Sequence, residues 1–358
     1  MLRLLPAIVF GLLLIPLAGT RAAEAVLNEQ LLSETLARAE SLPRLHALIV
    51  ARDGIPIVER VFRGPGLDTP VNIKSASKMI LDALVGIAIN RGMIKNVDQP
   101  ILPLLRNRAP DVLDPKVATI TVDHLLSMRA GLERTSGSQN YGRWVNSPNW
   151  IRFALTRPFV DEPGGEMLYS TGNTHMLSAI LTDVSGTNTL ELVREWLAKP
   201  LGITIPAWTR DPQGVYFGGN EMAVSPRALL RFGEMYRHGG TFEGKRVVPE
   251  SWIRASWTPV TTDRRGVGYG YGWFVGEALG EPVFYGWGYG GQMLYVIPTL
   301  KLTIVMTSDS SLGSDASGFI CALHDLVALG FMPAVMEKGP ENLPLVSACG
   351  VPADALQP

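Results

Sequence analysis

The sequence predicts an α+β protein, with an antiparallel sheet of about five strands flanked by helices and an all-α insertion. Three observations predict this fold. A helix and a hairpin open the chain, a long helical block fills its middle, and apolar strands return in its last third. At 46% hydrophobic and 18% charged residues over 358 positions, the chain can bury a sizeable core.

The opening elements are a helix, a hairpin and a second helix. Asn28 to Ala39 has helical periodicity, and residues 46–50 and 55–62 are typical of strands joined by the turn signal Asp53-Gly54. Met79 to Ile89 is apolar on nearly every face, which predicts a helix buried in the middle of a domain.

Capping residues divide the middle of the chain into helices separated by polar connections. A Ser or Thr precedes an apolar repeat at several positions, and Gly follows it. The expected helices are 122–126 after Thr121, 174–183 ending near Gly186, 190–198 after Thr189, and one running from Ser225-Pro226 to His238.

The last third predicts strands at 269–275, 283–285, 293–297 and 302–307, then a closing helix at 317–329. This order of elements predicts the domains. They are a signal peptide at 1–23, a sheet domain formed by 24–93 and 208–335, an all-α subdomain at 94–207, and an irregular C-terminal tail at 336–358.

The N-terminus predicts export. Arg3 forms a short basic region, Leu4 to Leu17 is apolar, and small residues follow up to Ala25, as in a secretory signal. We therefore expect a periplasmic or secreted protein with no stable membrane span after cleavage. In that setting Cys321 and Cys349 could form a disulfide, which the sequence leaves open.

Composition excludes other classes of function. A formal net charge of −1 and the lack of a Lys/Arg block argue against nucleic-acid binding. The five histidines have no metal-ligand spacing, so we expect neither metal nor cofactor. A small-molecule ester, amide or peptide-like substrate is the expected partner.

Ser75-Ala76-Ser77-Lys78 is the main catalytic candidate. Residues three apart on a helix share a face, so the Lys78 amine can reach the Ser75 hydroxyl and activate it as a nucleophile. Lys78 enters the apolar helix, and desolvation there favours a neutral amine that accepts a proton. The pattern is loose, and alone it is also consistent with a chance match.

Further motifs follow in an order that resembles the serine β-lactamase and penicillin-binding-protein superfamily, in its class C-related branch. They span nearly the whole chain after the leader. The matching segments are 72–78, 85–92, 120–132, 163–173 and 286–292. The resemblance implies a β-lactamase/transpeptidase-like fold and an acyl-enzyme on Ser75.

The resemblance also implies that Tyr169 works with Lys78 in moving the Ser75 proton, although a buried structural tyrosine is the ordinary alternative. A Lys78 ammonium beside the phenol would favour the phenolate. The family's Tyr-x-Asn is here Tyr169-Ser170-Thr171, which makes Thr171 a candidate substrate contact.

The third motif departs further from the family. Relatives place a cation on this strand to meet a substrate carboxylate, whereas this chain has Gly286-Trp287-Gly288. We expect Trp287 and Gly288 to contact substrate, and the N–H groups of Ser75 and Tyr289 to form an oxyanion hole. Packing within the strand is the alternative for both aromatic residues. Tyr141, in a polar loop, is a weaker candidate for the pocket.

These residues predict an exported serine hydrolase that acts on an ester or amide carbonyl. The missing cation favours esters or neutral amides and the branch with carboxylesterases and 6-aminohexanoate-oligomer hydrolases. A β-lactamase or D-Ala-D-Ala carboxypeptidase, and a non-catalytic binding module on the same fold, remain alternatives.

Overall fold

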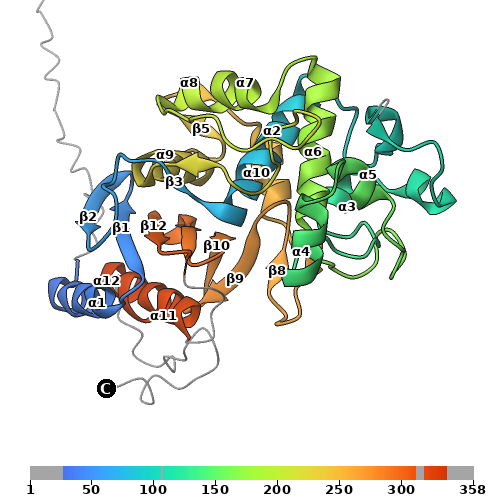
Figure 1. Cartoon of the computed structure of the whole chain (residues 1–358). Helices are drawn as coiled ribbons and strands as arrows, with labels where there is room; N and C mark the ends of the chain where they lie inside the picture. The colour runs from blue at the N-terminus through green and yellow to red at the C-terminus, as the bar shows by residue number, and fades with distance from the viewer. Residues whose placement is uncertain (1–26, 106–107, 312–317, 337–358) are drawn as a thin grey trace, which may run out of the picture.

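An eight-stranded antiparallel sheet runs through the computed structural model, in the order β2-β1-β12-β11-β10-β9-β8-β7 (Figure 1). The structure describes residues 27–105, 108–311 and 318–336. The predicted signal segment, Cys349 and nearly all of the predicted tail lie outside these residues. The strands are β1 (Leu45–Arg52), β2 (Ile55–Val61), β7 (Thr261–Thr262), β8 (Gly268–Tyr269), β9 (Phe274–Ala278), β10 (Glu281–Gly288), β11 (Gln292–Ile297) and β12 (Leu302–Ser308).

Helices cover this sheet, and two short strand pairs lie outside it. The pairs are β3 (Val71–Asn72) with β4 (Ala223–Val224), and β5 (Thr241–Phe242) with β6 (Lys245–Arg246). The α-helices are α1 (Glu29–Ser41), α2 (Lys78–Asn90), α3 (Val122–Leu126), α4 (Ser138–Val145), α5 (Trp150–Leu155), α6 (Thr171–Ser185), α7 (Thr189–Val193), α8 (Lys199–Leu201), α9 (Pro226–Arg237), α10 (Glu250–Ser256), α11 (Phe319–Leu326) and α12 (Met332–Val335).

Alternation along the strands gives the sheet two buried faces. Ile49 and Leu294 belong to the core that includes α2, whereas Leu48 and Tyr295 belong to the core that includes α11 and α12. Successive side chains of a strand point to opposite faces, so both faces must be covered by helices. Figure 1 shows α1, α11 and α12 together on one side and α2 and α9 on the other.

The predicted α+β class, opening hairpin and buried helix are confirmed. Asp53 and Gly54 both have positive φ, +50° and +79°, as a two-residue hairpin turn requires. Every residue from Lys78 to Ala88 of α2 is buried. The domain boundaries stay a prediction.

The expected number of strands, about five, is wrong, and so is the single strand at 269–275. Gly270 N–H donates to the Trp273 carbonyl at 3.0 Å, so the chain reverses there. Tyr269 pairs with Phe274 across this turn, and the aromatic run contributes the end of β8 and the start of β9. Two-residue strands such as β7 and β8 are too short to show alternation in a sequence.

A buried carboxylate anchors α2 one helical turn beyond Lys78. Asp82 accepts hydrogen bonds from Tyr236 Oη (2.9 Å), Trp252 Nε1 (3.0 Å) and Ser256 Oγ (2.9 Å). Burial raises the pKa of Asp82 well above its usual value, although these three bonds oppose the shift. The contacts hold α2 against α9 and α10. No helix of the described residues is long and apolar enough to cross a membrane.

Candidate active site

Ser75 and Lys78 lie where the 3₁₀ helix η1 (Lys74–Ser77) passes into α2. A 3₁₀ helix has three residues per turn, so positions i and i+3 face the same way. The Lys78 Nζ lies 3.1 Å from the Ser75 Oγ, which is hydrogen-bond distance. The structure therefore brings the predicted nucleophile and base together, with Ser75 partly exposed and Lys78 2% exposed.

The surroundings of Lys78 suit a neutral amine. Burial lowers the pKa of Lys78 to about 7. No carboxylate is within ion-pair distance of Nζ among the residues that the structure describes. Nζ also contacts the Gly219 carbonyl at 2.8 Å and Thr171 Oγ1 at 3.3 Å. A neutral amine can donate to these two oxygens and turn its lone pair toward the Ser75 hydroxyl.

Thr171, expected to contact substrate, is turned toward the base instead. Its Oγ1 lies 3.0 Å from Ser136 Oγ, and its backbone N–H donates to the same oxygen at 2.8 Å. Thr171 is 4% exposed at the start of α6. In this arrangement Thr171 orients the Lys78 amine and is itself held by Ser136.

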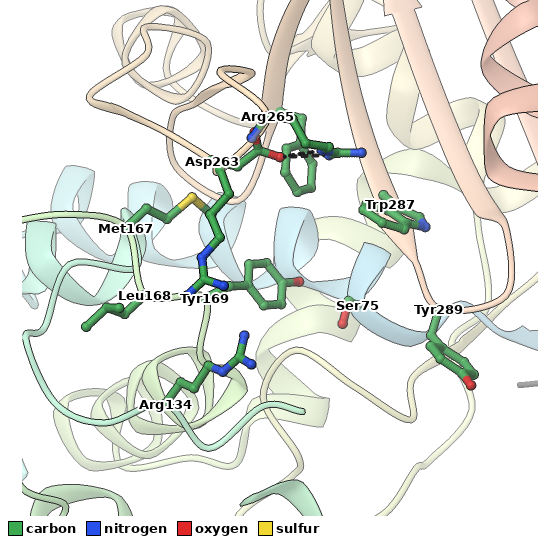
Figure 2. Close-up of a pocket in the computed structure, with 11 residues that line it drawn as sticks. Ser75, Arg134, Met167, Leu168, Tyr169, Asp263, Arg265, Trp287 and Tyr289 are labelled. Atoms are coloured by element: carbon green, nitrogen blue, oxygen red, sulfur yellow. Dashed lines mark hydrogen bonds and ion pairs between the residues drawn. The ribbon is translucent and has the colours of Figure 1, made fainter. Parts of the chain in front are cut away.

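Tyr169 lies beside the Ser75–Lys78 pair, with its hydroxyl toward Ser75 (Figure 2). The Lys78 Nζ is 5.0 Å from the centre of the Tyr169 ring. Burial raises the pKa of Tyr169 to about 12, while a hydrogen bond to Ser75 opposes this shift. Tyr169 is thus a phenol at neutral pH, and Lys78 has the lower pKa of the two.

The glycines of β10 allow this strand to pack against the catalytic segment. A Cβ on Gly286 would lie 2.1 Å from Met79 Sδ, and one on Gly288 would lie 2.2 Å from the Ile73 carbonyl oxygen. A side chain at 288 would meet backbone, and one at 286 would require the buried Met79 side chain to shift. Gly288, expected to contact substrate, packs closely against the segment that carries Ser75, so β10 lies directly beside that residue.

A pocket of about 470 Å³ opens beside Ser75. Two of the predicted site residues, Trp287 and Tyr289, line it, and Tyr289 is 46% exposed. Most of its wall is apolar, but arginines also reach it from two loops (Figure 2). The lining residues that the sequence did not indicate are Arg134, Met167, Leu168, Asp263, Arg264, Arg265 and Phe274.

The loop that ends in β4 holds the segment before Ser75, and nothing in the sequence indicated it. Glu221 accepts hydrogen bonds from Asn72 Nδ2 (2.7 Å) and Lys74 Nζ (3.1 Å). Met222 accepts a bond from Ile73 N–H at 3.0 Å. Lys74 has φ +51° and Glu221 φ +59°, a conformation that is costly for residues other than glycine. The contacts of Glu221 offset that strain at the residue preceding the nucleophile.

We expect Glu221→Ala to lower kcat about tenfold or more while KM changes little, because the Ser75 backbone loses its support but the pocket stays intact. Steady-state kinetics and thermal unfolding on the same preparation check this. Glu221→Gln, which can still accept the Asn72 bond, should fall between wild type and Glu221→Ala. Glu191→Gln, which removes an exposed ion pair with Arg194, is the control. A pure loss of stability with unchanged kcat would contradict the positioning role.

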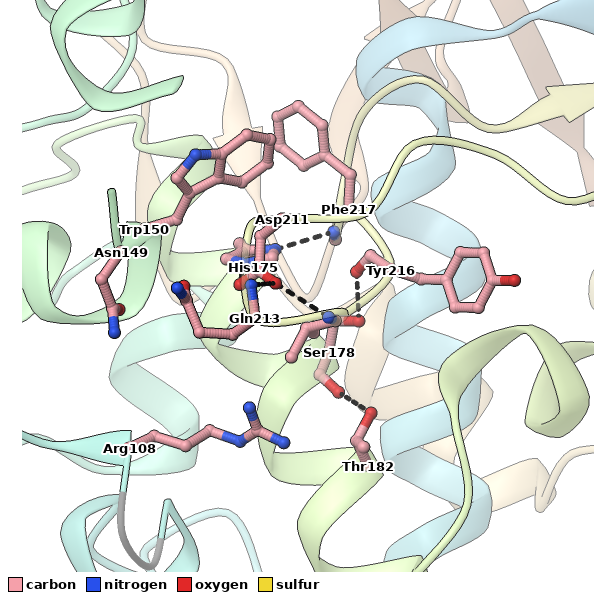
Figure 3. Close-up of polar contacts among 12 residues, drawn as sticks. Arg108, Asn149, Trp150, His175, Ser178, Thr182, Asp211, Gln213, Tyr216 and Phe217 are labelled. Carbon is pink, nitrogen blue, oxygen red and sulfur yellow. Dashed lines mark hydrogen bonds and ion pairs between the residues drawn. The ribbon is translucent and has the colours of Figure 1, made fainter. Parts of the chain in front are cut away.

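A buried histidine, His175, also contacts this loop (Figure 3). Gly218 N–H donates to His175 Nδ1 at 3.2 Å, so Nε2 carries the proton and donates to Asp211 Oδ2 at 3.0 Å. Burial lowers the pKa of His175, and the imidazole is neutral. His175 thus has a structural role, since it fixes the backbone next to Gly219.

Tyr141 is not among the residues that line the pocket. Its hydroxyl accepts a hydrogen bond from Asn220 Nδ2 at 2.7 Å, and its ring stacks on Phe217. It therefore supports the same loop. Within the described residues, no group of three or more His, Cys, Asp or Glu side chains is placed to hold a metal ion.

The chain is similar to known proteins over much of its length. The family model described as Beta-lactamase matches residues 46–318, well over half of the chain. The 6-aminohexanoate-dimer hydrolase of Paenarthrobacter ureafaciens is 26% identical over 220 residues, which are 58% of this chain and 56% of that protein. The chain thus matches little more than half the length of this relative.

Two solved structures show the same fold. The octameric penicillin-binding protein homologue from Pyrococcus abyssi has a TM-score of 0.66 at 20% identity, over 88% of this chain and 78% of its own. EstCE1, described as a hydrolase with promiscuous acyltransferase activity, has a TM-score of 0.67 at 18% identity, over 84% and 98%.

Proposed function

The chain belongs to the beta-lactamase family, and from this premise we propose that it is an exported serine hydrolase that cleaves an ester or amide through an acyl-enzyme on Ser75. The observation that carries the proposal is the 3.1 Å contact between Ser75 Oγ and a lysine amine whose pKa is lowered to about 7. Such an amine can accept the serine proton at neutral pH.

Acylation begins when Lys78 takes the hydroxyl proton and Ser75 Oγ attacks the carbonyl carbon. In this proposal the N–H groups of Ser75 and Tyr289, two residues that line the pocket, stabilise the oxyanion. Ser75 lies in the first turn of η1, where N–H groups lack partners within the helix. Tyr169 donates its proton to the departing oxygen or nitrogen as the bond to carbon breaks. Lys78 then returns a proton to Tyr169.

Deacylation repeats these roles with water. Lys78 accepts a proton from the water as its oxygen bonds to the acyl carbon, the bond to Ser75 breaks, and Ser75 regains a proton. Thr171 and Gly219 keep the amine aimed at this point through both steps. The name of the curated relative, a 6-aminohexanoate-dimer hydrolase, supports hydrolysis of an amide.

A substrate panel tests the proposal. We expect the purified protein to hydrolyse a short-chain 4-nitrophenyl ester and a small anilide, with the ester faster, because its leaving group needs less help from Tyr169. Nitrocefin and a D-Ala-D-Ala peptide are the competing substrates. Preference for either of these by kcat/KM would favour a β-lactamase or carboxypeptidase, and no turnover of any member would favour a binding module.

A further inference from the structure

Three arginines line the pocket beside Ser75, although the sequence placed no cation on β10. Arg134 precedes α4, while Arg264 and Arg265 lie in the turn between β7 and β8. Asp263 is the pocket's one acidic lining residue among those described. The lining of the pocket therefore carries more positive than negative charge.

Asp263 forms an ion pair with Arg265. Its Oδ2 accepts a hydrogen bond from Arg265 Nε at 2.9 Å and forms an ion pair with Nη2 at 2.8 Å. The Arg265 guanidinium also lies 5.2 Å from the centre of the Trp287 ring. The charge of Arg265 is thus largely offset, and Asp263 has little capacity left for a second cation.

Arg134 and Arg264 have no such partner. Among the described residues, no carboxylate lies within ion-pair distance of either guanidinium. Figure 2 shows the Arg134 side chain reaching toward Tyr169 and Ser75. The neighbouring wall, formed by Met167, Leu168 and Phe274, is apolar. Cations beside an apolar wall attract an anion more strongly than they would in open water.

We infer that Arg134 and Arg264 bind a carboxylate of the substrate, so that the preferred ester or amide carries a carboxylate on its acyl or its leaving part. A guanidinium presents a planar fork that matches a carboxylate, and the rest of the wall accepts the apolar part of such a molecule. The inference rests on the proposed function. It replaces the preference for neutral substrates that the missing cation on β10 suggested.

Two pairs of esters test the inference. Mono-4-nitrophenyl glutarate and its methyl-capped diester place a carboxylate, or none, on the acyl side. 3-Butyryloxybenzoate and its methyl ester do the same on the leaving side. We expect wild type to prefer the carboxylate in at least one pair, by about tenfold or more in kcat/KM, and the preference to shrink as salt is raised.

Matched variants assign the effect to residues. The preference ratio is kcat/KM for the carboxylate ester divided by kcat/KM for its methyl ester. In the double variant Arg134→Gln/Arg264→Gln this ratio should fall to near one. Asp263→Asn/Arg265→Gln, which removes the offset ion pair of the same pocket as a whole, should change the ratio by less than about threefold. Arg38→Gln, on the surface of α1, should change neither the ratio nor the rates. Equal rates for both members of both pairs in wild type, or a ratio that survives in the double variant, would overturn the inference.

Binding to Ser75→Ala separates this result from the proposed function. Calorimetry with the two glutarate esters and the two benzoates needs no turnover, so it remains decisive even if the enzyme fails to hydrolyse any ester. Tighter binding of the carboxylate member of a pair to Ser75→Ala supports the inference if it is lost when Arg134→Gln and Arg264→Gln are added to Ser75→Ala. Equal affinities within both pairs refute it, whether or not Ser75 is a nucleophile.

Discussion

Ser75→Ala should lower kcat/KM for a 4-nitrophenyl ester by at least about 10⁴-fold, because no other group can form the acyl-enzyme. The fold should be retained. Ser75 is only partly buried, and the side-chain contacts that the variant loses are those with the Lys78 amine and with Tyr169. Steady-state kinetics together with a thermal unfolding curve check both statements.

Ser77→Ala is the matched control for this variant. Ser77 lies in the same turn, is fully buried and donates its hydroxyl to the Lys74 carbonyl at 2.7 Å. The Ser77 hydroxyl is not one of the groups that contact the Lys78 Nζ, which are Ser75, Thr171 and Gly219. We expect it to keep activity within about tenfold of wild type. Comparable losses in the two variants would show that the effect comes from the turn and not from the nucleophile.

Lys78→Met should lower kcat by about 10³- to 10⁴-fold, since it removes the proton acceptor and keeps the shape of an unbranched side chain. In wild type, kcat/KM should rise with pH through about 7, where Lys78 loses its proton. The residual kcat/KM of Lys78→Met should not show this rise with pH. Lys301→Met, which removes an exposed lysine paired with Asp53, is the control.

The same variant should change the pH dependence of stability. The pKa of Lys78 is about 7 in the folded chain and 10.5 when unperturbed, so between these values the unfolded chain binds more protons. Stability of wild type should therefore rise with pH across this window, by at most about 1.4 kcal/mol per pH unit, relative to Lys78→Met. Urea unfolding of both proteins at pH 7.5 and 9.5 measures the difference. An equal change in the two proteins would mean that Lys78 is charged in the folded state.

The sequence predicted the parts of the fold that depend on local pattern. The Asp53-Gly54 turn, the apolar α2 and the Ser225-Pro226 helix start each have a signal within a few residues, and each is found. The β8–β9 reversal was missed because its aromatic residues favour a strand, whereas the glycines at 270 and 272 allow a turn. Tertiary pairing with β7 and β10 decided between the two.

The candidate site was predictable where chemistry requires a particular side chain. Ser75, Lys78 and Tyr169 come together as their order in the chain indicated. The carbonyl of Gly219 could not be predicted, because a backbone acceptor has no sequence signal. Arg134 and Arg264 lie in loops, and only the folded chain shows that both reach one pocket.

The most direct test of the account is the intact mass of the protein after reaction with a fluorophosphonate, followed by peptide mapping. The account predicts one added phosphonyl group, located on Ser75, in wild type and none in Ser75→Ala. Labelling should slow as pH falls below about 7, because protonated Lys78 no longer accepts the serine proton. An unlabelled wild-type protein, or a label on another residue, would contradict the assignment of Ser75 as the nucleophile.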